Sequence, residues 1–495
     1  MTTHYLACDL GAESGRLILG TLADGKLALE EVHRFANVPV EAPGMLHWDI
    51  PGLFTELKVG LKRAAQLRRP ISSFGCDSWG VDYLLFDANG EVIPPTYHYR
   101  DSRTAAGVKH AYAKIDWPTI FAETGIQFMP LNTLFQLAAE SPERLDRAHR
   151  LLLIADGFNF MLSGVADAEE SLASTSQLYS PRTRSWSGRL LQALDLPARL
   201  FPPIVPSGTK LGLLRDEIAR ESGLAGLEIL ATCSHDTAAA VAAVPTSSTA
   251  SHWAYISSGT WSLLGVQLPV PIINDTCREL NFTNEIGYGG SVRLLKNIVG
   301  LWIVQECRRA WAQAGLEFEY AALTDLAGKA PPFVSLINPT DPRFIAPGDM
   351  PRKIAEQCRE TGQTVPADPG AAVRCVLESL ALLYRRTLRQ VERITGSRMR
   401  RLHIVGGGSR NALLNQFTAD AVQIPVLAGP AEATAAGNIL VQAIALGHLP
   451  SLREAREVVR NSLELVTYEP QDAASWNDAY GRFENLFWDN SCARI

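Results

Sequence analysis

Residues 5–22 read YLACDLGAESGRLILGTL, and this stretch decides how the chain begins to fold. Apolar residues dominate on both sides of a small, polar segment at residues 9–16, which predicts two strands joined by a loop. Asp24 and Gly25 then predict a tight hairpin turn into a third strand that ends near residue 35. The loop therefore joins strand to strand, which excludes the glycine-rich phosphate motifs that open a helix.

Residues 9–16 are also candidates for binding phosphate. A turn of small residues presents backbone N–H groups on its concave side, where they hold anions. Asp9 is a candidate ligand of Mg²⁺ through water, since this ion keeps much of its hydration shell. Arg16 is a candidate for neutralising phosphate charge. A tight turn with a surface arginine explains the same residues equally well, so the loop alone does not decide.

The length of the chain predicts two domains. Its 495 residues exceed what a single hydrophobic core accommodates. The short polar segment PTSSTASHW at residues 245–253 is the best candidate for a boundary, which gives domains at 1–245 and 246–495. Directly after it, AYISSGTWSLLGVQL (254–268) repeats the pattern of strand, small-residue turn and strand. The sequence thus predicts two related halves that each open with a hairpin.

Composition argues against several classes of protein. Apolar residues make up 46%, charged residues 20%, and the net charge of −6 comes without a basic cluster, so we expect neither nucleic acid nor a membrane surface as partner. No apolar run approaches the roughly 18 residues of a membrane span, and no secretory signal is visible, so we expect the cytoplasm. The cysteines form no C-x-x-C pair, which argues against zinc. A bridge between Cys358 and Cys375 is a minority alternative.

Residues 234–241, SHDTAAAV, place an acid where a buried strand gives way to an alanine-rich helix. Taken alone, Asp236 is best explained as the N-cap of that helix. The functional alternative is a general base, because a carboxylate at a helix N-terminus stays ionised and takes the proton of a hydroxyl that attacks phosphorus. His235 would then hydrogen-bond a polyol.

Two further turns carry small residues. SSGTWS (257–262) offers the hydroxyl of Thr260 and backbone N–H groups in a hairpin, which suit a triphosphate, although a plain hairpin explains them too. GGGSRN (406–411) lies between an apolar strand and a helix. Three glycines there predict that a nucleoside or phosphate approaches the backbone at the helix N-terminus, whereas simple strand–helix packing seldom needs three.

CDSWGVDYLLFD (76–87) brings Trp79, Gly80 and Asp82 into one turn. An aromatic ring beside a carboxylate is typical of sugar sites, and a core tryptophan with a turn aspartate is as good an explanation. Residues 294–311 predict an amphipathic helix. Its uncharged polar interruptions are Asn297 and Gln305.

Taken together and in this order, the segments resemble the FGGY carbohydrate kinases, within the superfamily that also holds Hsp70 chaperones and actin. The resemblance covers nearly the whole chain, and the combination DLGAESGR, DSWGVDYLLFD, SHDTAAAV, YISSGTWSLLG, LKNIVGLW and VGGGSRN is specific. It implies an α/β fold of two ribonuclease-H-like domains around a central interdomain cleft. Sugar is expected mainly on the first domain, and ATP mainly on the second.

The resemblance also implies roles for individual residues. Those expected at ATP are Ala12, Glu13, Ser14, Gly15, Arg16, Thr260, Gln305 and Gly407. Those expected at the sugar are Gly80, His235, Asp236, Thr237 and Asn297, with Asp82 as the candidate named above. Asp236 is the expected base and Asp9 the magnesium-associated acid. Glu13 departs from expectation, because an acid beside a triphosphate is electrostatically unfavourable.

The implied reaction is transfer of a phosphoryl group from ATP, with Mg²⁺, to O1 of L-rhamnulose, a step in L-rhamnose degradation. L-Fuculose, L-ribulose and L-xylulose are alternative ketoses. An ATPase of the same superfamily that is not a kinase is a third possibility, against which the SWGVD turn and the His235–Asp236 pair argue. A monomer and a weak homodimer both remain open.

Overall fold

The computed structural model describes residues 2–246 and 252–488. By its internal contacts the chain divides into two compact units, and each is described here by itself. Unit 1 comprises Met1–Ser247, Gln267–Leu294 and Glu432–Leu463, and unit 2 comprises Ser248–Val266, Leu295–Ala431 and Glu464–Ile495. The expected boundary between residues 245 and 246 adjoins a segment, 247–251, outside the described residues, and it stays a prediction.

A six-stranded sheet of order β14-β15-β6-β1-β2-β3 forms the centre of unit 1. Its strands are β1 (Thr3–Leu10), β2 (Ser14–Ala23), β3 (Lys26–Ala36), β6 (Ile71–Ser78), β14 (Thr209–Leu213) and β15 (Glu228–Ala231). β1 and β2 pair antiparallel, and β3 follows across the turn at Asp24 and Gly25, so the predicted strand–loop–strand and hairpin are confirmed. β6 runs parallel to β1 and β15 parallel to β6, so these three strands end at the same edge.

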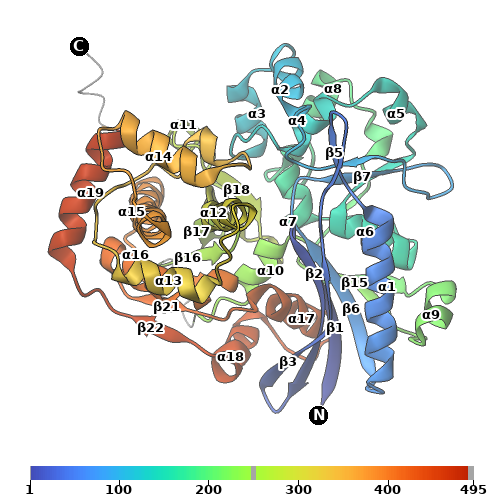
Figure 1. Cartoon of the computed structure of the whole chain (residues 1–495). Helices are drawn as coiled ribbons and strands as arrows, with labels where there is room; N and C mark the ends of the chain where they lie inside the picture. Colours follow the sequence, from blue (N-terminus) through green and yellow to red (C-terminus); the bar gives the residue numbers. More distant parts are fainter. Residues whose placement is uncertain (1, 247–251, 489–495) are drawn as a thin grey trace. The chain divides into compact units, whose positions relative to one another are not determined.

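Helices cover both faces of this sheet. α1 (Ile50–Gln66) lies along it, with Leu53, Leu57 and Leu61 buried at a spacing of one helical turn (Figure 1). α10 (Asp236–Ala242) follows β15, which confirms the predicted strand–turn–helix, and packs closely on α17 (Ala433–Ala445). A Cβ at Gly437 of α17 would lie 1.8 Å from the carbonyl oxygen of Ala239, so only glycine allows this approach.

The remaining elements of unit 1 are short and connect or flank the sheet. The strands are β4 (Val40–Ala42), β5 (Met45–Trp48), β7 (Tyr83–Phe86), β8 (Thr96–Tyr97), β9 (Arg150–Leu153), β10 (Ala168–Glu169), β11 (Tyr179–Ser180), β12 (Ser185–Trp186) and β13 (Ile204–Val205). The helices are α2 (Thr104–Tyr112), α3 (Trp117–Thr124), α4 (Thr133–Ala138), α5 (Pro142–Arg147), α6 (Ile154–Ser163), α7 (Glu170–Ala173), α8 (Gly188–Ala193), α9 (Asp216–Ser222), α11 (Asp275–Glu279) and α18 (Leu452–Ser462).

A seven-stranded sheet of order β18-β19-β17-β16-β20-β21-β22 runs through unit 2. Its strands are β16 (Trp253–Ser258), β17 (Trp261–Leu268), β18 (Thr283–Ile286), β19 (Val292–Val299), β20 (Arg401–Val405), β21 (Val426–Ala428) and β22 (Val466–Tyr468), of which β18 and the ends of β17 and β19 count with unit 1. β16 and β17 pair antiparallel, so the second predicted hairpin is confirmed.

The helices of unit 2 are α12 (Trp302–Gln313), α13 (Tyr320–Lys329), α14 (Met350–Glu360), α15 (Pro369–Thr395), α16 (Ala412–Val422) and α19 (Ala473–Phe487). The helix predicted over residues 294–311 was wrong in its first part, because Leu294–Val299 belong to strand β19. Gly300 separates strand from helix, and a Cβ there would lie 2.5 Å from Oγ of Ser262, so the chain passes too close to β17 for a side chain.

The structure also bears on the expectations about membrane spans and about a disulfide. No helix within residues 2–246 and 252–488 has the length and hydropathy needed to cross a membrane. Cys358 and Cys375 are both buried free thiols, so the disulfide considered from the sequence is not formed.

Candidate active site

Three aspartates gather where β1, β6 and β15 end in unit 1. Asp9 in β1 stands opposite Asp77 in β6, and Asp236 opens α10 just beyond β15. Asp9 is 6% exposed and Asp77 is fully buried. The carboxyl ends of adjacent parallel strands are where α/β sheets bind ligands. Sequence reasoning identified Asp9 and Asp236 but missed Asp77.

Asp236 is the most exposed of the three aspartates. It is the first helical residue of α10 rather than its N-cap, which is His235, so the capping explanation does not hold. Its side chain keeps 31% of its surface accessible and accepts a hydrogen bond from Oγ1 of Thr237 at 3.0 Å. Burial first, and Asp9 second, raise the pKa of Asp236 to about 7. The carboxylate is therefore reachable and poised near neutral pH, rather than always ionised as expected.

His235 is held by a buried ion pair. Nη2 of Arg293 lies 2.9 Å from Nδ1 of His235 and 3.1 Å from Oε2 of Glu285. Arg293 is fully buried and always protonated, so it donates and Nδ1 accepts. Burial and Arg293 hold the pKa of His235 well below its ordinary value. The ring is therefore neutral with its proton on Nε2, which lies 3.4 Å from Oδ1 of Asp236.

The loop at residues 9–16 is braced by an ion-pair network. Nη2 of Arg16 lies 2.5 Å from Oδ2 of Asp9, and Nη1 of Arg16 pairs with Glu432 just before α17. Gly15 packs directly against the ring of Phe35, and a Cβ at this position would lie 2.2 Å from that ring. The structure thus joins the two charged residues that the sequence assigned separately to magnesium and to phosphate.

The tip of this loop faces outward. Ala12 and Ser14 are half-buried, and Glu13 is exposed while its backbone carbonyl accepts from the N–H of Asn37 at 3.0 Å. The side-chain amide of Asn37 donates to the carbonyl of Gly11 at 2.9 Å. These bonds fix the path of the turn and leave the Glu13 side chain at the surface.

Magnesium fits this edge of the sheet only with help from a substrate. Among the described residues, no group of three or more Asp, Glu, His or Cys side chains could hold a metal ion by itself. Burial and the charge of Asp9 raise the pKa of Asp77 well above its ordinary value, and Oδ1 of Asp77 has no hydrogen-bond partner among those residues. A cation near Asp9 would relieve this repulsion, so the residues fit an ion that draws its other ligands from water and phosphate.

Gly80 and Asp82, two of the residues expected on the sugar side, lie between β6 and β7 of unit 1. Gly80 packs on Thr175, whose Oγ1 would lie 2.9 Å from a Cβ at that position. Asp82 is fully buried. Its Oδ2 accepts from Nε1 of Trp48 at 2.6 Å and Nε1 of Trp79 at 3.0 Å, and its Oδ1 from Nε2 of Gln136 at 2.9 Å. Both carboxylate oxygens of Asp82 therefore already accept hydrogen bonds from side chains of the protein. We interpret Asp82 as a structural residue that supports the turn at Gly80.

In unit 2 the hairpin at Ser258–Trp261 holds the start of α12. The carbonyls of Gly259 and Thr260 accept from the N–H groups of Leu301 at 3.2 Å and Trp302 at 3.1 Å. Nε2 of Gln305 donates to Oγ1 of Thr260 at 3.3 Å, and Oε1 of Gln305 has no hydrogen-bond partner within the described part of the chain. Thr260 and Gln305, both predicted at the nucleotide, are therefore direct neighbours.

The three glycines at residues 406–408, which we call the glycine turn, differ in their surroundings. A Cβ at Gly408 would lie 2.0 Å from Oγ of Ser258, and one at Gly406 would lie 3.0 Å from its carbonyl. A Cβ at Gly407 would meet no atom of the described residues within 4 Å. The expectation that a ligand explains all three glycines was wrong for Gly406 and Gly408, which pack on the hairpin. Gly407 alone faces open space.

Asn297 lies half-buried on β19 in unit 2, whereas His235, Asp236 and Thr237 lie in unit 1. Within unit 1 the structure brings together Asp9, Arg16, His235 and Asp236. Within unit 2 it brings together Thr260 and Gln305 beside Ser258, on which the glycine turn packs.

Sequence reasoning missed Asp77, Glu432 and the pair Arg293–Glu285. Asp77 is part of the quoted segment CDSWG, but only Trp79, Gly80 and the following Asp82 were interpreted as site residues. Arg293 stands near the start of a mostly apolar strand, and that was a usable signal, because a buried arginine is almost always paired. Glu432 carries no local signal, since its partner Arg16 is 416 residues away.

Comparisons with known proteins agree with this geometry. The N-terminal domain of the FGGY family of carbohydrate kinases matches residues 4–243, and its C-terminal domain matches residues 254–446. The chain is 42% identical to the rhamnulokinase of Bacteroides thetaiotaomicron over 98% of this chain and 99% of that one. It is 39% identical to the rhamnulokinase of Bacillus subtilis over 94% of this chain and 96% of that one.

Solved structures share the fold at low sequence identity. The ligand-bound xylulose kinase of Lactobacillus acidophilus has a TM-score of 0.81 at 15% identity and covers 98% of this chain and 97% of its own. Plasmodium falciparum glycerol kinase with ADP has a TM-score of 0.75 at 16% identity, with coverage of 97% and 98%. The predicted α/β fold of two domains is confirmed. The chain therefore belongs to the FGGY family of carbohydrate kinases and is a carbohydrate kinase.

Proposed function

We propose that this enzyme transfers the γ-phosphoryl group of ATP to O1 of L-rhamnulose. The geometry that carries the proposal is an accessible carboxylate, Asp236, whose pKa is raised to about 7 beside a histidine fixed as a neutral donor. Identity of about 40% to rhamnulokinases along nearly the whole chain supports the choice of sugar.

Asp236 acts as the general base. Its Oδ1 is already oriented by Thr237, and the carboxylate accepts the proton of the attacking hydroxyl as the O–P bond forms. A base whose pKa lies near the working pH combines a sufficient ionised fraction with a sufficient affinity for the proton. Thr237 is then a positioning residue, because its hydroxyl is used by Asp236.

His235 orients the sugar. Its Nε2–H lies beside Asp236, so a ketose hydroxyl that donates to Asp236 accepts a hydrogen bond from His235 through a lone pair. Two fixed partners at one edge of the sheet hold the nucleophilic oxygen in line for attack. Gly80 and Asn297 complete the proposed sugar contacts.

Residues 12–16 and Thr260 hold the phosphates. Arg16 exchanges part of its pairing with Asp9 and Glu432 for the phosphate oxygens, and this frees Asp9 to hold Mg²⁺ through water. When bound, Mg²⁺ neutralises phosphate charge. Gln305 and Gly407 line the nucleotide site. Gln305 offers an amide oxygen that no described residue hydrogen-bonds, and Gly407 offers its backbone to a flat ring or a phosphate.

Related ketoses are the runner-up substrates, because the same residues orient any ketose with a reactive O1. The cytoplasmic location and the oligomeric state, monomer or weak homodimer, stay predictions.

A ketose panel tests the proposal. ADP formation is measured with ATP, Mg²⁺ and, in turn, L-rhamnulose, L-fuculose, L-ribulose, L-xylulose or no sugar. We expect the highest kcat/KM with L-rhamnulose. A higher kcat/KM for another ketose would show that this ketose, and not L-rhamnulose, is the preferred substrate. Equal ATP turnover with and without sugar would refute the kinase reaction.

A further inference from the structure

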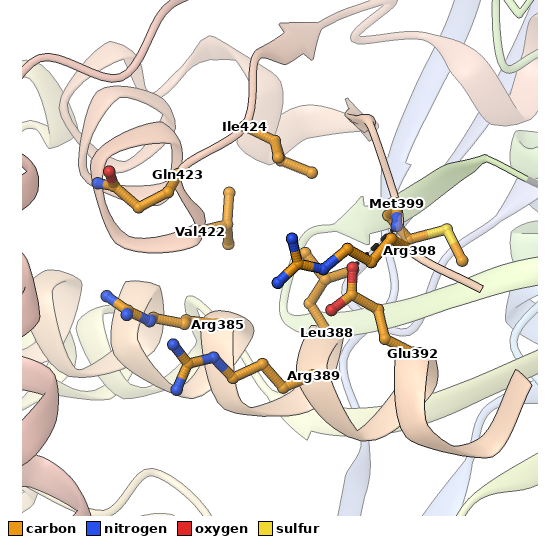
Figure 2. A pocket seen from close by; sticks show the side chains of 9 residues that line it. All are labelled: Arg385, Leu388, Arg389, Glu392, Arg398, Met399, Val422, Gln423 and Ile424. Carbon is orange, nitrogen blue, oxygen red and sulfur yellow. Dashed lines mark hydrogen bonds between the residues drawn. The ribbon is translucent and has the colours of Figure 1, made fainter. Parts of the chain in front are cut away.

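Unit 2 contains a pocket that the proposed reaction does not use. It has a volume of about 210 Å³ and lies between α15, the segment that follows it and the end of α16 (Figure 2). We call it the arginine pocket. The residues that give it its character are Arg385, Leu388, Arg389, Glu392, Arg398 and Gln423.

The lining of the arginine pocket is strongly basic. Arg385 and Arg389 lie one helical turn apart on the same face of α15, and Arg398 follows from the segment after the helix (Figure 2). Glu392 is the one acid among the lining residues, and its Oε1 accepts from the N–H of Met399 at 2.8 Å. Three guanidinium groups and one carboxylate leave a net charge of +2.

Arg385 is the buried anchor of this pocket. It is only 8% exposed, its Nη2 donates to Oδ1 of Asn477 at 2.6 Å, and its guanidinium lies 4.4 Å from the ring of Tyr480. Its Nη1 has no hydrogen-bond partner anywhere in residues 2–246 and 252–488. Burial and the neighbouring Arg389 lower the pKa of Arg385, and the smaller influences of Tyr480 and Glu484 oppose this shift. A buried donor without a partner beside a second cation favours an anion as the missing partner.

The arginine pocket is separate from the glycine turn. The chain leaves the pocket through β20, turns at Gly406–Gly408 and returns to the pocket through α16. α16 has 11 residues, which places its two ends about 16 Å apart. A ligand in the pocket therefore does not occupy the proposed nucleotide contact at Gly407.

We propose that the arginine pocket binds a small anion that carries a phosphate group, either inorganic phosphate or a phosphomonoester. The paired N–H groups of a guanidinium match the spacing of phosphate oxygens. Three guanidinium groups offer more hydrogen-bond donors than the two oxygens of one carboxylate accept. A dianion matches the net charge of +2. The volume is below the roughly 300–1,000 Å³ of sites for drug-sized ligands, which argues against a whole nucleotide.

Calorimetric titration of the full-length protein tests this site, which does not depend on the proposed kinase reaction. The probes are inorganic phosphate and glycerol 3-phosphate, with glycerol as the uncharged control, each up to about 10 mM. A saturating non-hydrolysable ATP analogue with Mg²⁺ is present throughout to occupy the nucleotide site. We expect both phosphates to bind and glycerol not to bind. Tighter binding of glycerol 3-phosphate identifies a phosphomonoester as occupant, and equal affinity identifies phosphate alone.

Variants locate the binding. R389Q/R398Q changes two exposed residues and is expected to weaken phosphate binding at least about tenfold. R393Q removes an exposed arginine of the same helix outside the lining and is expected to bind like the parent. E392Q keeps the acceptor for Met399, removes the negative charge and is expected to bind more tightly. Absence of binding to the parent protein, or equal binding by the parent and R389Q/R398Q, would overturn the proposal.

Discussion

Nη2 of Arg293 lies 2.9 Å from Nδ1 of His235, and this contact fixes which ring nitrogen of the histidine carries the proton. A fully buried arginine at the end of an apolar strand thus sets the donor that faces Asp236. Arg293 touches no substrate in our account. It is a positioning residue that acts through His235.

Removal of Arg293 should change the pH profile as well as the rate. R293M alone removes the positive charge that balances the buried carboxylate of Glu285, which costs about 3–5 kcal/mol, so the double variant R293M/E285Q is the one to measure. We expect kcat/KM to fall about 10- to 100-fold through loss of the oriented donor. We also expect the pKa of His235 to rise, because one cause of its depression is gone. NMR titration of the ring that shows no such rise would contradict the assignment.

The base assignment predicts the outcome of D236N. Loss of the proton acceptor should lower kcat by about 10²- to 10⁴-fold while ketose affinity largely survives. Asp216 supplies a matched control, since it is also the first residue of a helix, α9, and is exposed. D216N should keep the parent's kcat. Near-normal kcat in D236N would show that Asp236 is not the base.

The rate should depend on pH through Asp236. The pKa of this carboxyl is raised to about 7 and only the deprotonated form accepts a proton, so kcat/KM should rise with pH, with a half-maximum near pH 7. Below the midpoint it should fall about tenfold per pH unit. Asp9 is the second cause of the raised pKa, so a cation at Asp9 should lower the midpoint for kcat. A flat kcat/KM between pH 5 and about 8 would be incompatible with this role.

Asp82 should matter for stability. In D82N an amide N–H₂ replaces one carboxylate oxygen and must face donors on Trp48, Trp79 or Gln136. We expect a loss of about 2–4 kcal/mol in the free energy of unfolding, measured by urea denaturation with tryptophan fluorescence. D146N, at an exposed position of α5, is the control and should change little. If D82N is as stable as D146N, the carboxylate is not a structural acceptor.

The glycine turn offers a matched pair of variants. G408A should be destabilised by about 1–3 kcal/mol, because its Cβ would lie 2.0 Å from Oγ of Ser258. G407A meets nothing within 4 Å and should fold normally but raise KM for ATP. Thermal unfolding and ATP titration separate the two effects. Equal melting temperatures would refute the packing explanation, and an unchanged KM in G407A would remove Gly407 from the nucleotide site.

Much of the fold could be predicted because its signals are local. Apolar runs on both sides of small residues predicted both hairpins, and the strand–turn–helix at Asp236 followed from SHDTAAAV. The strand at Leu294–Val299 was mistaken for helix because a buried strand and a buried helix give similar apolar runs. The close approach of Ser262 to Gly300, which separates strand from helix, is a tertiary contact.

The site was predictable in part for the same reason. Asp9, Arg16 and Asp236 stand in recognisable motifs, whereas the pairing of Arg16 with Glu432 spans 416 residues. The structural role of Asp82 could not be predicted, because a sequence does not show that a carboxylate already accepts hydrogen bonds from tryptophan N–H groups. Burial and pairing therefore decided the roles that residue type alone left open.

Phosphorus NMR of the reaction products tests the central claim most directly. ATP, Mg²⁺ and L-rhamnulose are incubated with the enzyme, and the spectrum is recorded with proton coupling. We predict ADP and one phosphomonoester whose phosphorus couples to the two protons on C1, in equal amounts. Inorganic phosphate with ADP and no ester, or an ester at another carbon, would contradict the proposed function.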